Sequence, residues 1–145
     1  PLFCGFYLNE LLVRLLHREE SLPSLFDAYE ASLDLLSQTE QQADVVLRHF
    51  EFRLLDVLGY GVSLDCDSRG VALQSDHCYR LVPEEGLVED ARGNFPGRYL
   101  NDIATGCWHD KSRRAARDLM REALAPHLGG RPLESRKLFR HSGKT

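Results

Sequence analysis

The chain of 145 residues carries 18 Lys and Arg against 22 Asp and Glu, which gives a formal net charge of −4 at pH 7. Its length suits one domain that buries about two thirds of the surface of its unfolded chain. With 43% hydrophobic and 28% charged residues, the composition excludes an intrinsically disordered chain and is that of an ordinary folded domain.

The first part of the sequence predicts three amphipathic helices. Residues 7–17 place apolar side chains at the i, i+3, i+4 spacing of one buried stripe, formed by Leu8, Leu11, Leu12, Leu15 and Leu16. A second helix is expected after Ser21, whose hydroxyl can cap free backbone N–H groups, with Pro23 in its first turn. A third, over residues 40–58, ends at Gly59, which can adopt the left-handed conformation.

The helical period disappears in the middle of the sequence. Over residues 62–90, short apolar fragments alternate with Gly, Pro, Ser and Asp, which indicates a loop-rich segment with a small hairpin. Helical periodicity returns weakly over residues 98–104 and strongly over 111–125, and a final short helix is expected over 133–140. The predicted fold is therefore mainly α, a single helical domain over residues 1–145 with a loop-rich insertion over 62–110.

The start of the chain resembles neither a signal peptide nor a membrane span. It has no basic segment, and Asn9 and Glu10 interrupt any apolar run. An apolar start without Met indicates instead a piece of a longer polypeptide.

Four cysteines are spread without C-x-x-C spacing, which favours reduced thiols in a cytosol. A metal site from Cys66, His77, Cys78, Cys107 and His109 is not expected, because zinc ligands usually come in closely spaced pairs. A Cys/His nucleophile is not excluded by spacing, so a Cys-dependent hydrolase remains an alternative. No paired acid/base arrangement stands out, and no enzyme activity or cofactor is expected.

Charge is distributed unevenly along the chain. Residues 1–110 have 8 Lys and Arg against 19 Asp and Glu, whereas residues 111–145 have 10 against 3. Within the second region, Arg113, Arg117 and Arg121 follow each other at i+4 steps, so that one helix ridge can face phosphates. A second basic set follows a Gly-Gly turn and comprises Arg136, Lys137 and Arg140. The alternative is that these residues only balance the acidic surplus of the same chain.

A second candidate binding site lies on the third predicted helix. Arg48 follows Leu47 and precedes Phe50, so a cation stands beside apolar side chains. Such an arrangement can receive a peptide that ends in a hydrophobic residue and a free carboxylate. The alternative is an Arg that covers the core with its aliphatic stem and serves no partner.

Four stretches, in order along the chain, resemble the RecO family of bacterial recombination mediators. They are residues 2–12 (LFCGFYLNELL), 47–61 (LRHFEFRLLDVLGYG), 123–133 (ALAPHLGGRPL) and 134–140 (ESRKLFR). The resemblance implies an N-terminal OB-fold, absent from this sequence, a helical domain and a zinc-ribbon-like module. The module would be degenerate here, because the paired cysteines of zinc-bearing members are missing.

The resemblance also implies a function. Family members bind single- and double-stranded DNA, anneal strands and, with RecR, help the recombinase to displace single-stranded-DNA-binding protein. They bind the acidic C-terminal tail of that protein, the ligand that a site at Leu47, Arg48 and Phe50 would suit. The expectation is thus a cytoplasmic, nucleoid-associated DNA-repair adaptor with no membrane contact, and a purely structural helical module is the alternative.

Overall fold

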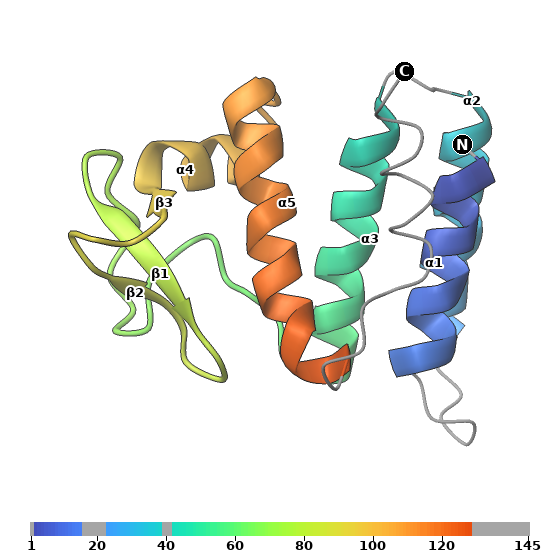
Figure 1. Cartoon of the computed structure of the whole chain (residues 1–145), viewed down its shortest axis with the longest axis horizontal. Coiled ribbons are helices and arrows are strands. Elements are labelled where there is room, and N and C mark those ends of the chain that lie inside the picture. The colour runs from blue at the N-terminus through green and yellow to red at the C-terminus, as the bar shows by residue number, and fades with distance from the viewer. Residues whose placement is uncertain (1, 16–22, 39–41, 129–145) are drawn as a thin grey trace. The chain divides into compact units, whose positions relative to one another are not determined.

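The computed structural model describes residues 2–15, 23–38 and 42–128 (Figure 1). The chain divides into two compact units, residues 1–54 together with 125–145, and residues 55–124. The segment predicted as an insertion, residues 62–110, lies within the second unit. That the whole chain is a single domain stays a prediction.

The first unit is built from helices. It contains α1 (Leu2–Leu15), α2 (Pro23–Gln38), most of α3 (Ala43–Leu58) and the short 3-10 helix η2 (Ala125–Leu128) (Figure 1). The three predicted helices are confirmed, but α1 begins at Leu2 rather than near residue 7. The reason is that Cys4 is buried one turn before Leu8, so the apolar stripe starts earlier than the leucine spacing indicated.

Side chains from all three helices form the core of this unit. Its most deeply buried members are Leu8, Leu11, Phe50 and Leu54. Phe50 of α3 packs edge-on against Tyr29 of α2, with ring centroids 6.3 Å apart. An Arg14 Nη2 donates a hydrogen bond of 2.8 Å to the carbonyl oxygen of Leu128, which ties the end of α1 to η2.

The second unit begins with the end of α3 and contains a three-stranded antiparallel sheet. Its strands are β1 (Cys78–Val82), β2 (Gly86–Glu89) and β3 (Phe95–Pro96), in the order β2-β1-β3 (Figure 1). In the hairpin of β1 and β2, Tyr79 pairs with Glu89 and Val82 with Gly86. The small hairpin expected in this segment is therefore confirmed.

Two helices follow the sheet, α4 (Gly97–Thr105) and α5 (Asp110–Leu124). Both agree with the predicted helices to within one residue at each end. The sheet and α4 bury Tyr79, Leu87, Phe95, Leu100 and Ile103. A Cβ at Gly97 would lie 1.9 Å from the carbonyl oxygen of Gln74, so only glycine fits where β3 turns into α4. The fold is mainly α with a small sheet, which confirms the predicted fold class.

The final helix expected over residues 133–140 lies outside the described residues. None of the helices in the described part of the chain combines the length and the apolar character that a membrane crossing requires.

Candidate binding sites on helices α3 and α5

The predicted partner site on α3 is largely buried. Leu47 is 5% exposed and Phe50 is 1% exposed, so both belong to the core of the first unit. The Arg48 side chain is 11% exposed, and its Nε lies 2.6 Å from Oε1 of Glu51, one turn further along the helix. Of the three predicted residues, Arg48 is the most accessible, and its charged group is the one that could reach a partner.

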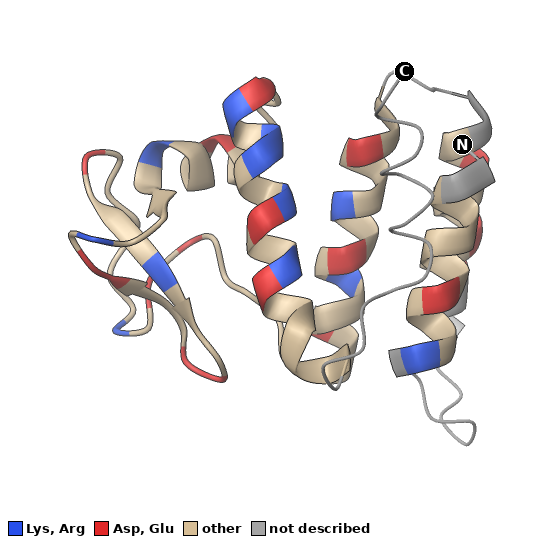
Figure 2. Cartoon of the chain, viewed as in Figure 1, with Lys and Arg blue, Asp and Glu red and all other residues tan. Residues whose placement is uncertain are grey.

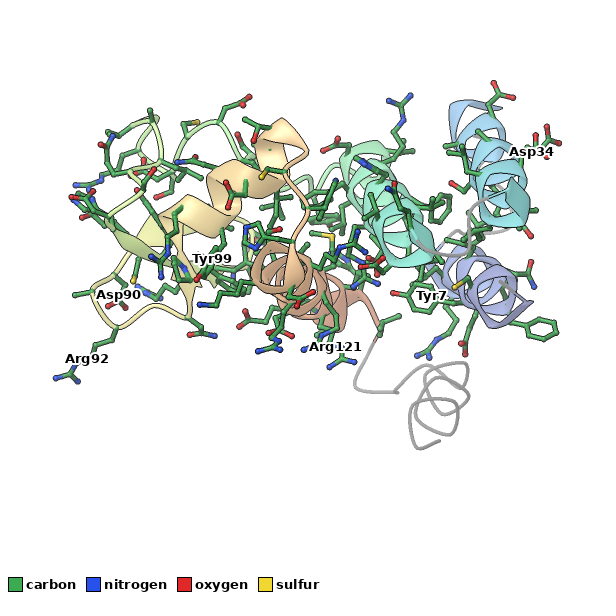
Figure 3. The ribbon with its side chains drawn as sticks, turned by 90° about the horizontal axis from the view of Figure 1, so that it is seen from above. Tyr7, Asp34, Asp90, Arg92, Tyr99 and Arg121 are labelled. Atoms are coloured by element: carbon green, nitrogen blue, oxygen red, sulfur yellow. The ribbon has the colours of Figure 1, made fainter. Side chains whose placement is uncertain are left out.

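Glu51 explains why Arg48 is held so firmly. Glu51 is a buried carboxylate, 1% exposed, and the hydroxyl of Tyr7 on α1 donates a hydrogen bond to its Oε2. Tyr7 lies between α1 and α3 in Figure 3. A buried charge is costly unless it is paired, so the guanidinium of Arg48 and the Tyr7 hydroxyl together stabilise Glu51. Arg48 is therefore first a structural partner of Glu51.

A groove of about 450 Å³ lies between α2 and α3. Asp27, Ala28, Ala31 and Ser32 line it from α2, and His49, Phe50 and Arg53 line it from α3. His49 and Arg53 are exposed, whereas Phe50 is almost completely buried. The groove thus combines an apolar floor with two basic side chains on its α3 edge, and Leu47 and Arg48 are not part of its lining.

Helix α5 separates apolar from basic residues clearly. One face buries Ser112, Ala115, Ala116, Leu119, Met120 and Leu124. Beside this face Arg117 and Arg121 are exposed and Arg113 is half-buried, which places the three arginines of the predicted ridge along one edge of the helix. Figure 2 shows that Lys and Arg recur along α5 with Asp and Glu between them. In Figure 3 the side chain of Arg121 projects away from the helix.

Acidic residues accompany this ridge. Arg117 Nε lies 3.2 Å from Oδ1 of its neighbour Asp118. Glu122 follows Arg121, and burial, together with the negative charge of Asp118, raises the pKa of its carboxyl group. The second basic set of Arg136, Lys137 and Arg140 lies outside the described residues.

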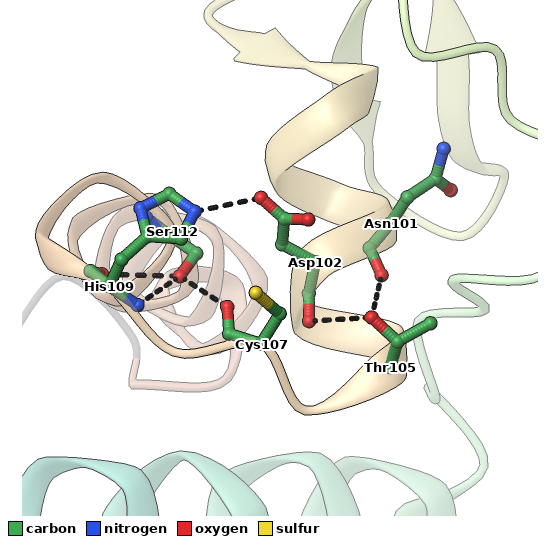
Figure 4. A network of polar contacts seen from close by, with 6 residues as sticks. All are labelled: Asn101, Asp102, Thr105, Cys107, His109 and Ser112. Atoms are coloured by element: carbon green, nitrogen blue, oxygen red, sulfur yellow. Dashed lines mark hydrogen bonds and ion pairs between the residues drawn. The ribbon is translucent and has the colours of Figure 1, made fainter.

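The start of α5 carries a polar network that sequence reasoning missed (Figure 4). Ser112 Oγ accepts a hydrogen bond of 2.9 Å from the backbone N–H of His109 and donates one of 2.9 Å to the carbonyl oxygen of Cys107. The Ser112 N–H points back to His109 Nδ1 at 3.4 Å. These reciprocal bonds resemble a capping box, which satisfies N–H groups in the first turn.

The His109 ring also connects α5 to α4. Its Nε2 lies 2.7 Å from Oδ2 of Asp102, and both ring contacts together fit the tautomer with the proton on Nε2. The ring packs edge-on against Tyr99, with centroids 5.8 Å apart, and the guanidinium carbon of Arg98 lies 4.8 Å from the centre of the Tyr99 ring. The spacing in the sequence could have predicted that His109 belongs to this surface. It stands four residues before Arg113 and so extends the arginine series by one step.

The cysteines differ in accessibility. Cys4 is buried, and burial raises the pKa of its thiol, which makes it a poor nucleophile. Cys66 and Cys78 are half-buried and Cys107 is exposed, so burial alone does not exclude a Cys-dependent hydrolase. Among residues 2–15, 23–38 and 42–128, no group of three or more His, Cys, Asp or Glu is placed to hold a metal ion.

The family model and the relatives that match this chain all belong to the same family of proteins. A family model described as the C-terminal part of recombination protein O matches residues 2–137. DNA repair protein RecO of Stutzerimonas stutzeri strain A1501 is 49% identical over 142 residues, which cover 95% of this chain and 60% of the relative. The protein of the same name from Pseudomonas aeruginosa strain LESB58 is 48% identical with the same coverage. That of Pseudomonas putida strain GB-1 is 46% identical over 143 residues, with 96% and 63% covered. The chain therefore spans about three fifths of the length of these curated relatives.

Proposed function

Since this chain belongs to the RecO family of DNA repair proteins and corresponds to its C-terminal part, we propose that it acts by binding, as the helical portion of a recombination mediator. It contributes DNA affinity through α5 and receives the tail of single-stranded-DNA-binding protein at α3. Its partners in this role are single- and double-stranded DNA, that protein and RecR, in the cytoplasm at the nucleoid. The proposal includes no bond-making chemistry.

The observation that carries the proposal is the exposed arginine ridge of α5. Arg113, Arg117 and Arg121 run along the edge of the face that buries Ala116, Leu119 and Met120, so the helix is held by its apolar side while Arg117 and Arg121 stay exposed. Steps of four residues correspond to about 6 Å along a helix axis. Guanidinium groups at this interval can contact successive phosphates, and each contact releases counterions from the DNA.

The test compares two double variants by fluorescence anisotropy with a labelled single strand at moderate salt. Arg117→Ala with Arg121→Ala should weaken binding several-fold. Arg80→Ala with Arg92→Ala removes the same charge from exposed arginines of the sheet region in the same unit, and it should change affinity much less. Equal losses in both would show that net charge, and not the ridge, governs binding.

The partner site is proposed at the groove between α2 and α3, next to the predicted residues Leu47, Arg48 and Phe50. An acidic peptide that ends in a hydrophobic residue fits this groove, because Phe50 gives an apolar floor and the exposed Arg53 supplies positive charge. Arg48 directly precedes His49 of the groove edge and is paired with Glu51. Because Glu51 offsets its charge, Arg48 holds the α3 edge in place, and Arg53 supplies the positive charge that attracts the tail.

This site is tested with a fluorescent peptide that copies the acidic tail. Arg53→Ala should weaken peptide binding several-fold, since an exposed cation is lost while the core is left intact. Arg92→Ala, an exposed arginine of the second unit, is the matched control. Arg48→Lys keeps the charge beside Glu51 and should retain most of the affinity, and peptide binding that is unaffected by Arg53→Ala would move the site away from this groove.

The zinc-ribbon-like module implied by the resemblance is proposed to be the segment around the β1–β2 hairpin in a degenerate form. Cys66 and Cys78 are its only cysteines, and each is half-buried. The hairpin there is supported by backbone pairing and by the aromatic core of Tyr79 and Phe95.

A purely structural helical module is the second candidate. The pair of Arg117 with Asp118 favours it, because this contact neutralises part of the ridge within α5 itself. An exposed pair of adjacent residues is worth little in water, however, and phosphates can compete with it.

A further inference from the structure

The arginine ridge of α5 ends, at its N-terminal side, on an aromatic cluster. His109, Arg113, Arg117 and Arg121 are spaced four residues apart, and His109 contacts the ring of Tyr99 on α4. A ligand that follows the ridge toward the start of α5 therefore reaches Tyr99.

The cluster is ordered by contacts on both helices. Tyr99 and Asp102 stand one turn apart on α4, and both contact His109, the first through its ring and the second through Nε2 at 2.7 Å. Arg98 stacks its guanidinium over the Tyr99 ring at 4.8 Å. The Asp102 carboxylate is thus engaged by His109 within the cluster.

The same groups stay accessible to solvent. The side chain of His109 is 42% exposed, Arg98 is exposed and Tyr99 is half-buried. An exposed planar cation stacked on a partly exposed aromatic ring is a surface on which a nucleobase can stack.

We propose that Tyr99, with Arg98 and His109, is a base-stacking platform for single-stranded DNA at the end of the α5 ridge. This inference rests on the proposed DNA-binding role of α5. The ridge would hold the phosphates of the strand, and the platform would take an unpaired base. In a duplex the faces of the bases are covered by their neighbours, so the platform favours single strands, whereas the ridge alone serves both forms.

The experiment measures affinities of the purified protein for three labelled DNAs of equal length: a thymidine strand, the same strand with abasic sites throughout, and a duplex. Wild type should bind the thymidine strand several-fold more tightly than the abasic strand, because the two have the same phosphates and differ only in their bases. Tyr99→Ala should lose at least about fivefold of its affinity for the thymidine strand, as expected for the loss of one stacked base, with the abasic strand and the duplex little changed.

Two further variants serve as controls. One tests whether the ring or the hydroxyl of Tyr99 is needed, and the other tests whether any exposed tyrosine would do. Tyr99→Phe keeps the ring and should retain the preference for bases. Tyr60→Ala removes an exposed tyrosine from the loop that follows α3 in the same unit and should leave the preference intact. The wild-type comparison of thymidine with abasic strands needs no mutation, so it tests the proposal even where Tyr99→Ala fails to fold.

Each outcome decides between the two proposals. Equal wild-type affinity for thymidine and abasic strands, or a Tyr99→Ala variant that keeps the full preference, overturns the platform while leaving the ridge in place. A wild-type protein that binds none of the three DNAs overturns the DNA-binding role of α5 and the platform with it. A preference for bases that is lost only in Tyr99→Ala supports both.

Discussion

Glu51 is the residue whose surroundings say most about the energetics of the first unit. Its carboxylate is buried, with the Tyr7 hydroxyl on one oxygen and Arg48 Nε 2.6 Å from the other. Removing one member of a buried ion pair costs roughly 3–5 kcal/mol, because the remaining charge has no partner and little water. Arg48 therefore matters for folding whether or not it contacts a partner.

The first prediction follows from this pair. Arg48→Ala should lower the free energy of unfolding by about 3 kcal/mol, near the lower end for buried pairs because the Arg48 side chain keeps 11% exposure. Denaturant unfolding followed by circular dichroism measures the loss. The double variant Arg48→Ala with Glu51→Gln should recover part of it, since the buried charge is then absent, and a single variant as stable as wild type would contradict the argument.

Glu122 gives a prediction with a defined pH dependence. Burial, followed by the charge of Asp118, raises the pKa of its carboxyl in the folded state, so the ionised form destabilises the fold at neutral pH. The cost disappears as pH falls and the carboxyl binds a proton. Glu122→Gln should thus have a slightly higher melting temperature than wild type at pH 7 and the same melting temperature near pH 3.5, and the difference should be small because Glu122 is exposed and solvent screens its charge. Thermal melts at both pH values check this, and a larger gain at low pH would reverse the assigned direction.

At the scale of elements, the sequence predicted every described α-helix, because each buries a stripe at helical spacing. The stripe of α5 also fixed which side is exposed, and so the arginine ridge followed from periodicity alone. The family resemblance carried by four sequence stretches was likewise confirmed. Periodicity did not show where α1 begins, since Cys4 was not counted with the leucines.

The parts of the site that sequence reasoning missed depend on contacts between elements. The groove beside Phe50 needs α2 next to α3, and the cluster around Tyr99 needs α4 next to the start of α5. The Glu51 partner of Arg48 was within reach of sequence reasoning at i+3, but its burial was not, because that depends on Tyr7 from another helix.

Two glycines provide an element-scale prediction with opposite signs. A Cβ at Gly97 would meet the Gln74 carbonyl oxygen at 1.9 Å, so Gly97→Ala must displace the backbone where β3 enters α4. At Gly5, inside α1, the nearest atom would be Leu33 Cδ2 at 3.7 Å, an ordinary contact. Gly97→Ala should destabilise the protein by about 1–3 kcal/mol, whereas Gly5→Ala should stabilise it by roughly 0.5–1 kcal/mol through higher helix propensity. Denaturant midpoints measure both, and equal shifts of the same sign would refute the steric argument.

At the scale of the whole molecule, binding of DNA by a chain of net charge −4 requires that charge be segregated. Residues 111–145 hold 10 of the 18 Lys and Arg and only 3 of the 22 Asp and Glu. The same segregation permits the opposite behaviour, in which the acidic surplus of residues 1–110 neutralises the basic region. Ionic strength distinguishes the two possibilities by the direction in which DNA affinity changes. Salt lowers the affinity of arginines that already contact phosphates, whereas it frees arginines that are paired with acidic residues of the chain and so first maintains or raises their affinity.

If the ridge binds phosphates, the logarithm of single-strand affinity should fall linearly with the logarithm of salt concentration. Three phosphate contacts give a slope of about −2, and Arg117→Ala should reduce its magnitude by about 0.7. If the ridge is instead neutralised internally, added salt first releases it from its own acids, and affinity stays flat or rises before it falls. Titrations of wild type and Arg117→Ala between low and physiological salt measure both slopes. Parallel lines for the two proteins would show that Arg117 contacts no phosphate, and a flat wild-type line would favour the structural module over the mediator.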